Sequence, residues 1–118
     1  MGRFEVTVTV ANTASPERST DVSLLVDTGA TVSCLPRSVL EGLGVRTVSR
    51  SRFLLPDGRR IERETGVVLF HFDGRVAGAP VMFAESGDAG VLGATALEAL
   101  GLAVDPVKQR LVPHDLYI

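Results

Sequence analysis

The sequence holds one cysteine, no tryptophan and few aromatic residues, which make up 5% of its 118 positions. One cysteine excludes an internal disulfide and indicates a reducing compartment. Neither sign of charge dominates, because 12 basic residues stand against 14 acidic ones and the formal net charge is -2. This balance argues against a protein dedicated to binding nucleic acid. The apolar runs are far shorter than the roughly 20 residues of a membrane-spanning helix, so no membrane partner is expected.

The N-terminal residues lack the apolar core of a signal peptide, since Glu5 interrupts the only early apolar stretch. Together with the lone cysteine, this predicts a cytoplasmic location. With 45% hydrophobic residues, a chain of this length can bury a core without disulfides or a structural metal. No linker, low-complexity tract or repeat divides the sequence. We therefore expect residues 1–118 to form a single domain.

Much of the sequence has the pattern of β-strands. Apolar and polar residues alternate over residues 4–10, and an apolar stretch at residues 22–26 ends at an acidic residue. Between residues 45 and 83, the Asp57-Gly58 and Asp73-Gly74 turns predict successive hairpins, because such turns need positive φ angles. The strands that flank these turns are predicted at residues 53–55, 67–70 and 81–83.

Two short helices are expected. The first covers residues 36–44, with Pro36 in the first turn and Gly44 at the C-terminal stop. The second covers residues 94–102 and ends at Gly101. A last pair of strands is predicted at residues 102–104 and 109–112. The sequence thus predicts an all-β domain with a short C-terminal helix.

The most informative segment is the end of the second predicted strand, where Asp27, Thr28 and Gly29 follow apolar residues. A carboxylate at the end of a hydrophobic strand must find partners, because burying an isolated charge is costly. Thr28 offers a hydroxyl, and Gly29 allows another backbone to approach without a Cβ in the way. By itself the tripeptide is also consistent with an Asx turn at a strand end.

Further segments favour the functional interpretation. The apolar pair and glycine at Val91-Leu92-Gly93 stand just before the C-terminal helix, and the Asp57-Gly58 turn lies between them and Asp27-Thr28-Gly29. In this order the segments resemble the single-domain, retroviral-type (retropepsin-like) aspartic proteases of clan AA, a kind also found in bacteria. The resemblance extends over nearly the whole chain. It implies an acid-protease fold: an all-β, retropepsin-like closed β-barrel protomer with a short C-terminal helix.

The resemblance also implies how the protein would act. An aspartic protease needs two carboxylates that share one proton around a water, and the sequence contains one Asp-Thr-Gly. A homodimer is therefore implied, in which Asp27 of each protomer activates the water that hydrolyses a peptide bond, without cofactor or metal. Thr28 would hydrogen-bond across the two-fold axis, and Gly29 would bond the backbone of a peptide or unfolded-protein substrate.

A set of substrate-binding residues follows from the same resemblance. The hairpin around residues 55–59 would close over the peptide as a flap and exclude water. The substrate-binding residues implied in the active loop, in the flap and in the later apolar pair are Ala30, Thr31, Leu55, Pro56, Asp57, Gly58 and Val91.

The sequence departs from the retroviral pattern at two linked positions. Thr31 and Ala94 stand where retroviral members carry an Asp and an Arg that pair with each other. Their joint replacement avoids a buried unpaired charge and implies a dimer stabilised in another way. Retroviral members interleave their termini in a shared sheet, and the corresponding candidates here are residues 4–10 and 111–118.

Two other functions stay open at this point. One is a catalytically inactive dimeric module that keeps the fold and binds peptides or partners. The other is a nucleic-acid module that uses the arginine cluster at residues 46–63, although a solvated face of edge strands explains these arginines as well. Cys34 is expected to be a small core residue. His71 and His114 are too scattered to form a metal site with it.

Overall fold

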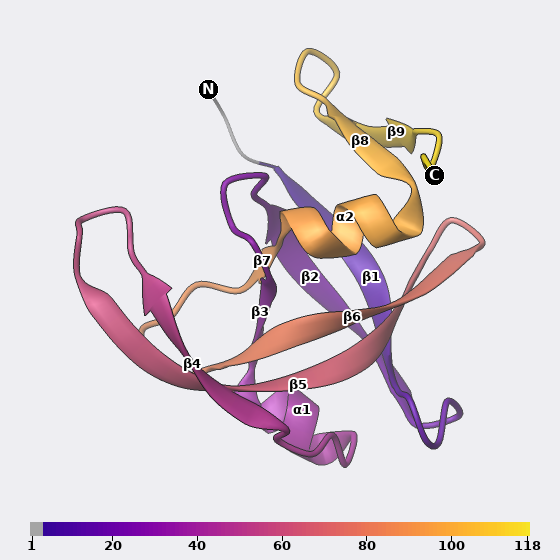
Figure 1. Ribbon diagram of the computed structural model, residues 1–118. Coiled ribbons are helices and arrows are strands. Elements are labelled where there is room, and N and C mark those ends of the chain that lie inside the picture. The colour runs from indigo at the N-terminus through magenta and orange to yellow at the C-terminus, as the bar shows by residue number, and fades with distance from the viewer. Residues whose placement is uncertain (1–3) are drawn as a thin grey trace.

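The structure, a computed structural model, describes residues 4–118, most of which lie in β-strands (Figure 1). The strands are β1 (Glu5–Asn12), β2 (Ser19–Val26), β3 (Ser33–Pro36), β4 (Ser49–Leu54), β5 (Arg60–Phe72), β6 (Arg75–Ala84), β7 (Val91–Leu92), β8 (Leu102–Asp105) and β9 (Arg110–Pro113). Among the described residues, the helices are α1 (Arg37–Gly42) and α2 (Ala94–Leu100). The predicted all-β class is confirmed.

Six of the described strands form a ring. One seven-stranded sheet has the order β1-β2-β7-β3-β6-β5-β4, and β1 also pairs with β5 through residues 9–12 and 68–71. This extra pairing closes every strand of the sheet except β4 into a barrel. The short β7 strand lies between β2 and β3, because it pairs in parallel with β2 and antiparallel with β3. On its other side, β3 pairs in parallel with β6.

The core fills the interior of this ring, because alternate residues of each strand point inward. Phe70 and Phe83 are the largest fully buried side chains, at no more than 1% exposure. The α2 helix packs against β6 and adds Ala96, Leu97 and Leu100 to the same core. Each large apolar side chain buried in this way contributes about 1.5–3 kcal/mol.

Both predicted helices are present, with shifted ends. The α1 helix begins at Arg37 and not at Pro36, because Pro36 keeps an extended ψ of 136° as the last residue of β3. Gly44 follows the helix with a φ of 75°, as expected of a C-terminal stop. The α2 helix ends before Gly101, which is left-handed with a φ of 70°.

The two predicted hairpins are confirmed, and their strands are longer than the apolar patterns indicated. Gly58 has a φ of 90°, and both Asp73 and Gly74 have positive φ angles, as tight hairpin turns require. The predicted strand at residues 67–70 is only part of β5, which is 13 residues long. Its first half carries charged side chains that obscure the alternation of apolar and polar residues.

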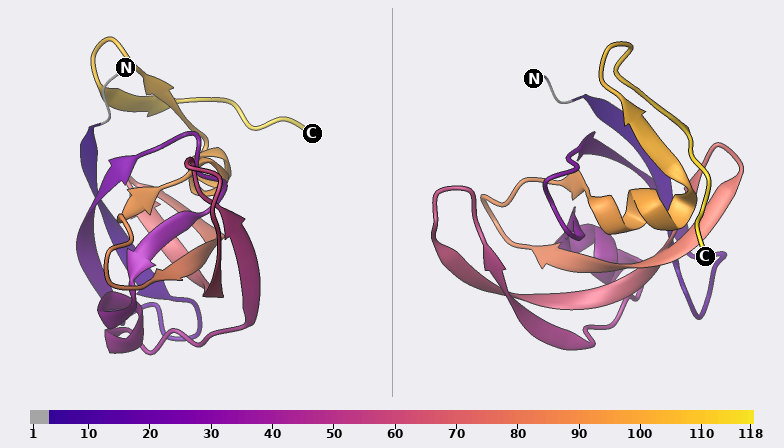
Figure 2. Two further views of the ribbon diagram at one scale, coloured as in Figure 1. Left: turned by 90° about the vertical axis from the view of Figure 1, so that its left-hand side faces the viewer. Right: turned by 45° about the horizontal axis from the view of Figure 1, so that its top comes forward.

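The C-terminal strands form a separate hairpin. The β8 and β9 strands pair with each other in a two-stranded sheet, as predicted. Figures 1 and 2 show this hairpin at the same end of the molecule as the loop between β2 and β3 and the beginning of β1. Within residues 4–118, no helix is long and apolar enough to span a membrane.

Candidate active site

Three strands fix the backbone of Asp27. The β2 strand ends at the buried Val26, and β7 runs alongside it with Val26 paired to Leu92. The backbone N–H of Asp27 donates to the carbonyl of Leu92 at 2.9 Å, and β7 is itself paired with β3. The apolar strands thus anchor the backbone in the barrel, while the Asp27 side chain is half-buried.

The residues after Asp27 form a tight loop (residues 27–32, the active loop). The backbone N–H of Gly29 donates to Oδ1 of Asp27 at 2.9 Å, and Ala30 N–H donates to the Asp27 carbonyl at 3.1 Å. A Cβ at position 29 would lie 3.2 Å from that carboxylate oxygen, so Gly29 leaves room for the bond. Thr28 and Gly29 are exposed. The Asx-type bond of the simpler interpretation therefore exists, and it orients the carboxylate.

The junction between β7 and α2 holds the other side of the active loop. The first two backbone N–H groups of α2 donate to the carbonyls of Ala30 and Thr31 at 2.7 and 3.0 Å. Gly93 approaches so closely that a Cβ there would lie 2.7 Å from the Val32 carbonyl oxygen. Its N–H donates to the fully buried Ser33 hydroxyl at 2.9 Å. Ser33 was not among the residues predicted from the sequence, where its signal was a hydroxyl within an apolar stretch.

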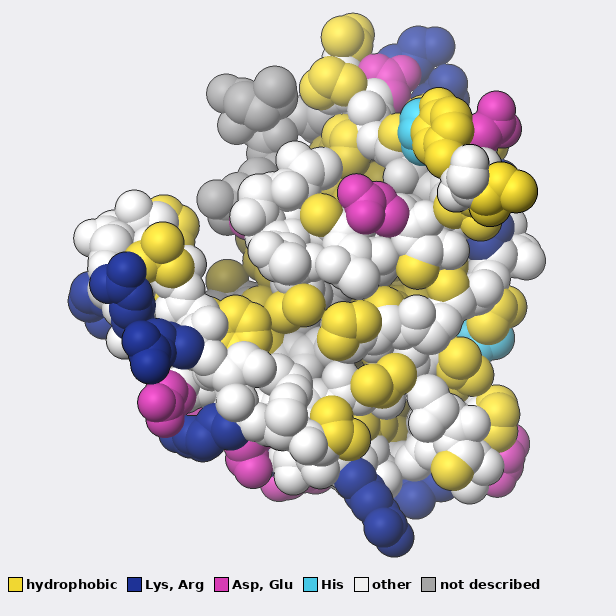
Figure 3. Space-filling model, viewed as in Figure 1, with side chains coloured by type: hydrophobic (Ala, Val, Ile, Leu, Met, Phe, Trp, Pro, Cys, Tyr) yellow, Lys and Arg dark blue, Asp and Glu magenta, His cyan; other side chains and the backbone are white. Residues whose placement is uncertain are grey.

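The predicted flap is the hairpin of β4 and β5, with its tip at residues 55–59. Gly58 N–H donates to the Leu55 carbonyl at 2.9 Å, and Leu55 N–H donates to the Arg59 carbonyl at 2.8 Å. The Asp57 carboxylate accepts from the backbone and the guanidinium of Arg59, and these bonds lower the pKa of Asp57. Figure 3 shows a notch between this hairpin and the body of the molecule, so the tip stands apart from the active loop.

One face of the sheet connects the active loop with the flap. Directly paired residues lie on the same face, as do residues two apart along a strand. Cys34 pairs with Met82, Met82 pairs with Thr65, and Arg63 lies two residues before Thr65. The same face continues along the flap to Phe53. This row of side chains leads from β3, directly after the active loop, to the flap.

Cys34 is not the core residue that the sequence predicted. Its neighbours Ser33 and Leu35 take the inward positions of β3, so Cys34 points to the other face and is half-buried. Its sulfur lies 3.9 Å from the Met82 sulfur. Burial raises the pKa of the Cys34 thiol to about 11, with smaller contributions from the charges of Asp88 and Asp27.

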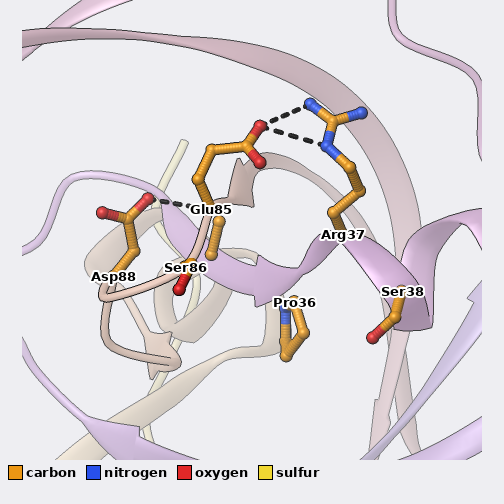
Figure 4. Close-up of a pocket in the computed structure, with 7 residues that line it drawn as sticks. Pro36, Arg37, Ser38, Glu85, Ser86 and Asp88 are labelled. Atoms are coloured by element: carbon orange, nitrogen blue, oxygen red, sulfur yellow. Dashed lines mark hydrogen bonds and ion pairs between the residues drawn. The ribbon is translucent and has the colours of Figure 1, made fainter.

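A network of charges lies beyond the predicted site. Arg63 on β5 pairs with Asp88 in the loop between β6 and β7 (residues 85–90, the β6–β7 loop). Arg37 pairs with Glu85 of the same loop and with Glu64. Figure 4 shows the Arg37–Glu85 contact beside a pocket lined by Pro36, Arg37, Ser38, Ala84, Glu85, Ser86 and Asp88. Sequence reasoning could not find these pairs, because their members lie far apart along the chain.

The remaining arginines of the 46–63 cluster are partly neutralised. Arg50 pairs with Glu62 at 3.2 Å, and both side chains are more than half exposed. Arg59 pairs with Asp57 at the tip. These contacts favour the solvated face over a nucleic-acid interface. Over residues 4–118, no group of three or more His, Cys, Asp or Glu side chains is placed to hold a metal ion.

The family is decided by comparison with known sequences. A family model described as aspartyl protease matches residues 6–96, which include the active loop, the flap and the β7–α2 junction. The chain belongs to the aspartyl protease family. No curated protein matches this aspartyl protease significantly.

Solved structures share the fold of this aspartyl protease. The EIAV protease complexed with the inhibitor HBY-793 has a TM-score of 0.67 and 22% identity, over 85% of this chain and 89% of that one. The simian foamy virus (mac) protease has a TM-score of 0.51 and 18% identity, over 78% and 91%. A retropepsin-like aspartic protease from Rickettsia conorii has a TM-score of 0.49 and 18% identity, over 89% and 86%. The likeness to the EIAV and simian foamy virus proteases confirms the predicted retropepsin-like fold.

Proposed function

We propose that this aspartyl protease is an endopeptidase that works as a homodimer, with Asp27 of each protomer in one shared site. The observation that carries the proposal is a single Asp-Thr-Gly, presented at the protomer surface on a loop that three strands hold in place. The chemistry requires two carboxylates, so the second comes from a second copy. A two-fold axis through the site brings the two copies of Asp27 together.

In this site the two carboxylates act on one water. So close together they cannot both be ionised, and the pair therefore holds a single proton. The ionised carboxylate removes a proton from the water, which attacks the peptide carbonyl carbon. The protonated carboxylate donates to the developing oxyanion, and a carboxylate later protonates the leaving amine. Gly29 keeps Oδ1 of Asp27 in a fixed orientation during these steps.

The other residues of the active loop bind and align. The exposed Thr28 hydroxyl would bond across the two-fold axis and join the two loops. Because the N–H of Gly29 is committed to Asp27, its carbonyl is the group that would bond the peptide backbone. Ala30 and Thr31, whose carbonyls are held by α2, would line the path of the peptide.

The flap would cover the bound peptide. Leu55, Pro56, Asp57 and Gly58 form its tip, and closure over the notch in Figure 3 would exclude water. Val91 is buried in the protomer beside Cys34, so it would form the floor of a side-chain pocket.

The C-terminal end offers a surface for the second copy. Val107 in the β8–β9 turn is 89% exposed, and Leu116 and Tyr117 in the tail are 70% and 81% exposed. Large apolar side chains left exposed in this way are typical of interaction surfaces. The β8–β9 hairpin lies at the same end of the molecule as the active loop, where a shared site requires the contact (Figures 1 and 2).

The test is cleavage of a diverse library of unstructured peptides from about pH 3 to pH 8, with the mass of each protein measured by light scattering. The wild type should be a dimer that cuts, and Asp27→Asn should be a dimer that does not. Asp73→Asn is the matched control, because this aspartate lies in the β5–β6 turn and Asn also tolerates its positive φ. A well-formed dimer that cuts no peptide would favour the inactive binding module.

A further inference from the structure

The Arg63–Asp88 pair is the least exposed ion pair that the described residues make. Arg63 Nε donates to Asp88 Oδ2 at 2.8 Å and Nη2 donates to Oδ1 at 3.1 Å, which makes the contact bidentate. The two side chains are 22% and 16% exposed. Bidentate arginine–carboxylate pairs that are shielded from water are stronger and more specific in geometry than exposed pairs.

The pair joins the flap to the β6–β7 loop. Arg63 lies on the β5 arm of the flap opposite Ser51, on the face that also carries Met82 and Cys34. Asp88 lies in the β6–β7 loop, which leads directly into Val91. One side of the contact therefore belongs to the flap, and the other belongs to the loop that leads to Val91, the proposed floor of a side-chain pocket.

Asp88 also organises the loop that carries it. Its Oδ2 accepts from the backbone N–H of Glu85 at 2.8 Å, and its own N–H donates to the Glu85 carbonyl at 2.9 Å. Two residues later, the Gly90 carbonyl accepts from the N–H of Leu25 in β2 at 3.2 Å. A short continuous path thus leads from Arg63 through the loop to β2, the strand that directly precedes Asp27.

A second arginine holds the start of the same loop. Arg37 donates to Oε2 of Glu85 at 2.7 and 3.0 Å, as Figure 4 shows, and its guanidinium lies 5.0 Å from the ring centre of Phe83. Arg37 also pairs with Glu64, the neighbour of Arg63 on β5. The β6–β7 loop is therefore tied down at both of its acidic residues.

We propose that Arg63 is a positioning residue of the protease: through Asp88 it holds the β6–β7 loop at a fixed distance from the flap arm, which keeps the cleft shaped for the peptide. This inference rests on the proposed function. Arg63 does not act on the reacting atoms. Its effect reaches the substrate through the loop and Val91, because a wall that shifts by a fraction of an ångström misaligns the peptide.

A second ion pair on the same hairpin provides a control, which separates the positioning effect of Arg63 from the effect of removing any positive charge. Arg50 and Glu62 also form an ion pair, but they join only the two strands of the flap and lie on its outer face, 59% and 60% exposed. Arg50→Met removes the same charge from the same hairpin and leaves the β6–β7 loop untouched. It therefore serves as the control for Arg63→Met.

Two readouts test the inference, and one of them does not depend on cleavage. Hydrogen exchange of the backbone amides of residues 85–90 should speed up about tenfold in Arg63→Met and stay unchanged in Arg50→Met. For a peptide that the wild type cuts, kcat/KM should fall about tenfold in Arg63→Met, mainly through a higher KM. Arg63→Lys should give an exchange rate and a kcat/KM between those of the wild type and Arg63→Met, because an ammonium keeps the charge but loses the bidentate geometry.

Unchanged exchange in Arg63→Met, or an equal change in Arg50→Met, would overturn the inference. So would faster exchange with an unaltered KM and kcat, since the loop would then move without consequence for the substrate. A wild type that cuts no peptide refutes the proposed function instead. In that case the exchange comparison still decides whether Arg63 holds the loop.

Discussion

The hydroxyl of Ser33 accepts a hydrogen bond from the backbone N–H of Gly93 at 2.9 Å, and Ser33 is fully buried. This contact joins β3 to the junction of β7 and α2, directly behind the active loop. The loop that carries Asp27 is therefore held from the far side by residues that would never touch a substrate. A loop held in this way can present a carboxylate with little cost of reorganisation.

Replacing Ser33 with alanine should destabilise the fold. The Gly93 N–H would lose its partner in the interior, and a buried unsatisfied donor costs about 1–3 kcal/mol. Denaturant unfolding followed by circular dichroism measures this loss. Ser23→Ala is the control, because its hydroxyl bonds Glu5 on the exposed face of the sheet and should matter little. Equal stability of the two variants would contradict the role given to Ser33.

Adding a single methyl group at Gly93 should displace the active loop. A Cβ there would lie 2.7 Å from the Val32 carbonyl oxygen and 2.8 Å from that of Ala30, and both atoms are backbone. We expect Gly93→Ala to cost about 1–3 kcal/mol in the free energy of unfolding, together with a large loss of any cleavage activity. Gly78→Ala should be tolerated, because its nearest atoms lie 3.8 Å away.

The contribution of Asp88 to stability should depend on pH. Hydrogen bonds from Arg63 lower the pKa of Asp88, so the folded state favours the ionised carboxylate. The stabilisation is therefore complete above the unfolded pKa, at about 4, and is lost as the pH falls through the lower folded pKa. At neutral pH the free energy of unfolding of the wild type should exceed that of Asp88→Asn. The difference between the two free energies should become smaller as the pH falls. A gap that stays constant down to about pH 2 would refute this linkage.

Cys34 should react slowly with alkylating reagents. Its pKa of about 11 leaves little thiolate at neutral pH, and the thiolate is the reactive form. Mass spectrometry after brief iodoacetamide treatment at about pH 8 should find the folded protein almost unmodified, whereas the same chain in denaturant should react fully. Fast alkylation of the folded chain would mean that the burial of Cys34 does not persist in solution.

The apolar tail should support the proposed dimer. Replacing Leu116 and Tyr117 with serine removes exposed apolar area from the C-terminal end. The dissociation constant of the variant dimer should therefore be about tenfold or more higher than that of the wild-type dimer. Sedimentation or light scattering over a dilution series measures this. Val76→Ser is the control, since Val76 is 55% exposed at the start of β6. Identical dissociation of both variants would place the interface elsewhere.

Much of the fold could be predicted because its signals are local. The turn at Asp73-Gly74 needs positive φ angles that few residue pairs adopt, and the alternation in β1 depends only on neighbouring residues. The Asp27-Thr28-Gly29 loop likewise depends on residues within a few positions of one another. The first half of β5 could not be predicted as a strand from its local pattern, because its charged residues pair with residues of other elements.

The sequence by itself determined which residues are the candidates for the chemistry, since the type and order of Asp27, Thr28 and Gly29 predict the loop that they form. Only the tertiary structure decided what holds that loop and shapes the cleft around it. Ser33 meets Gly93, and Arg63 meets Asp88, because β7 inserts between β2 and β3 and because β5 folds back along β6. Distances of about 3 Å between residues far apart in the chain are set by the pairing of strands, and no local pattern of residues encodes them.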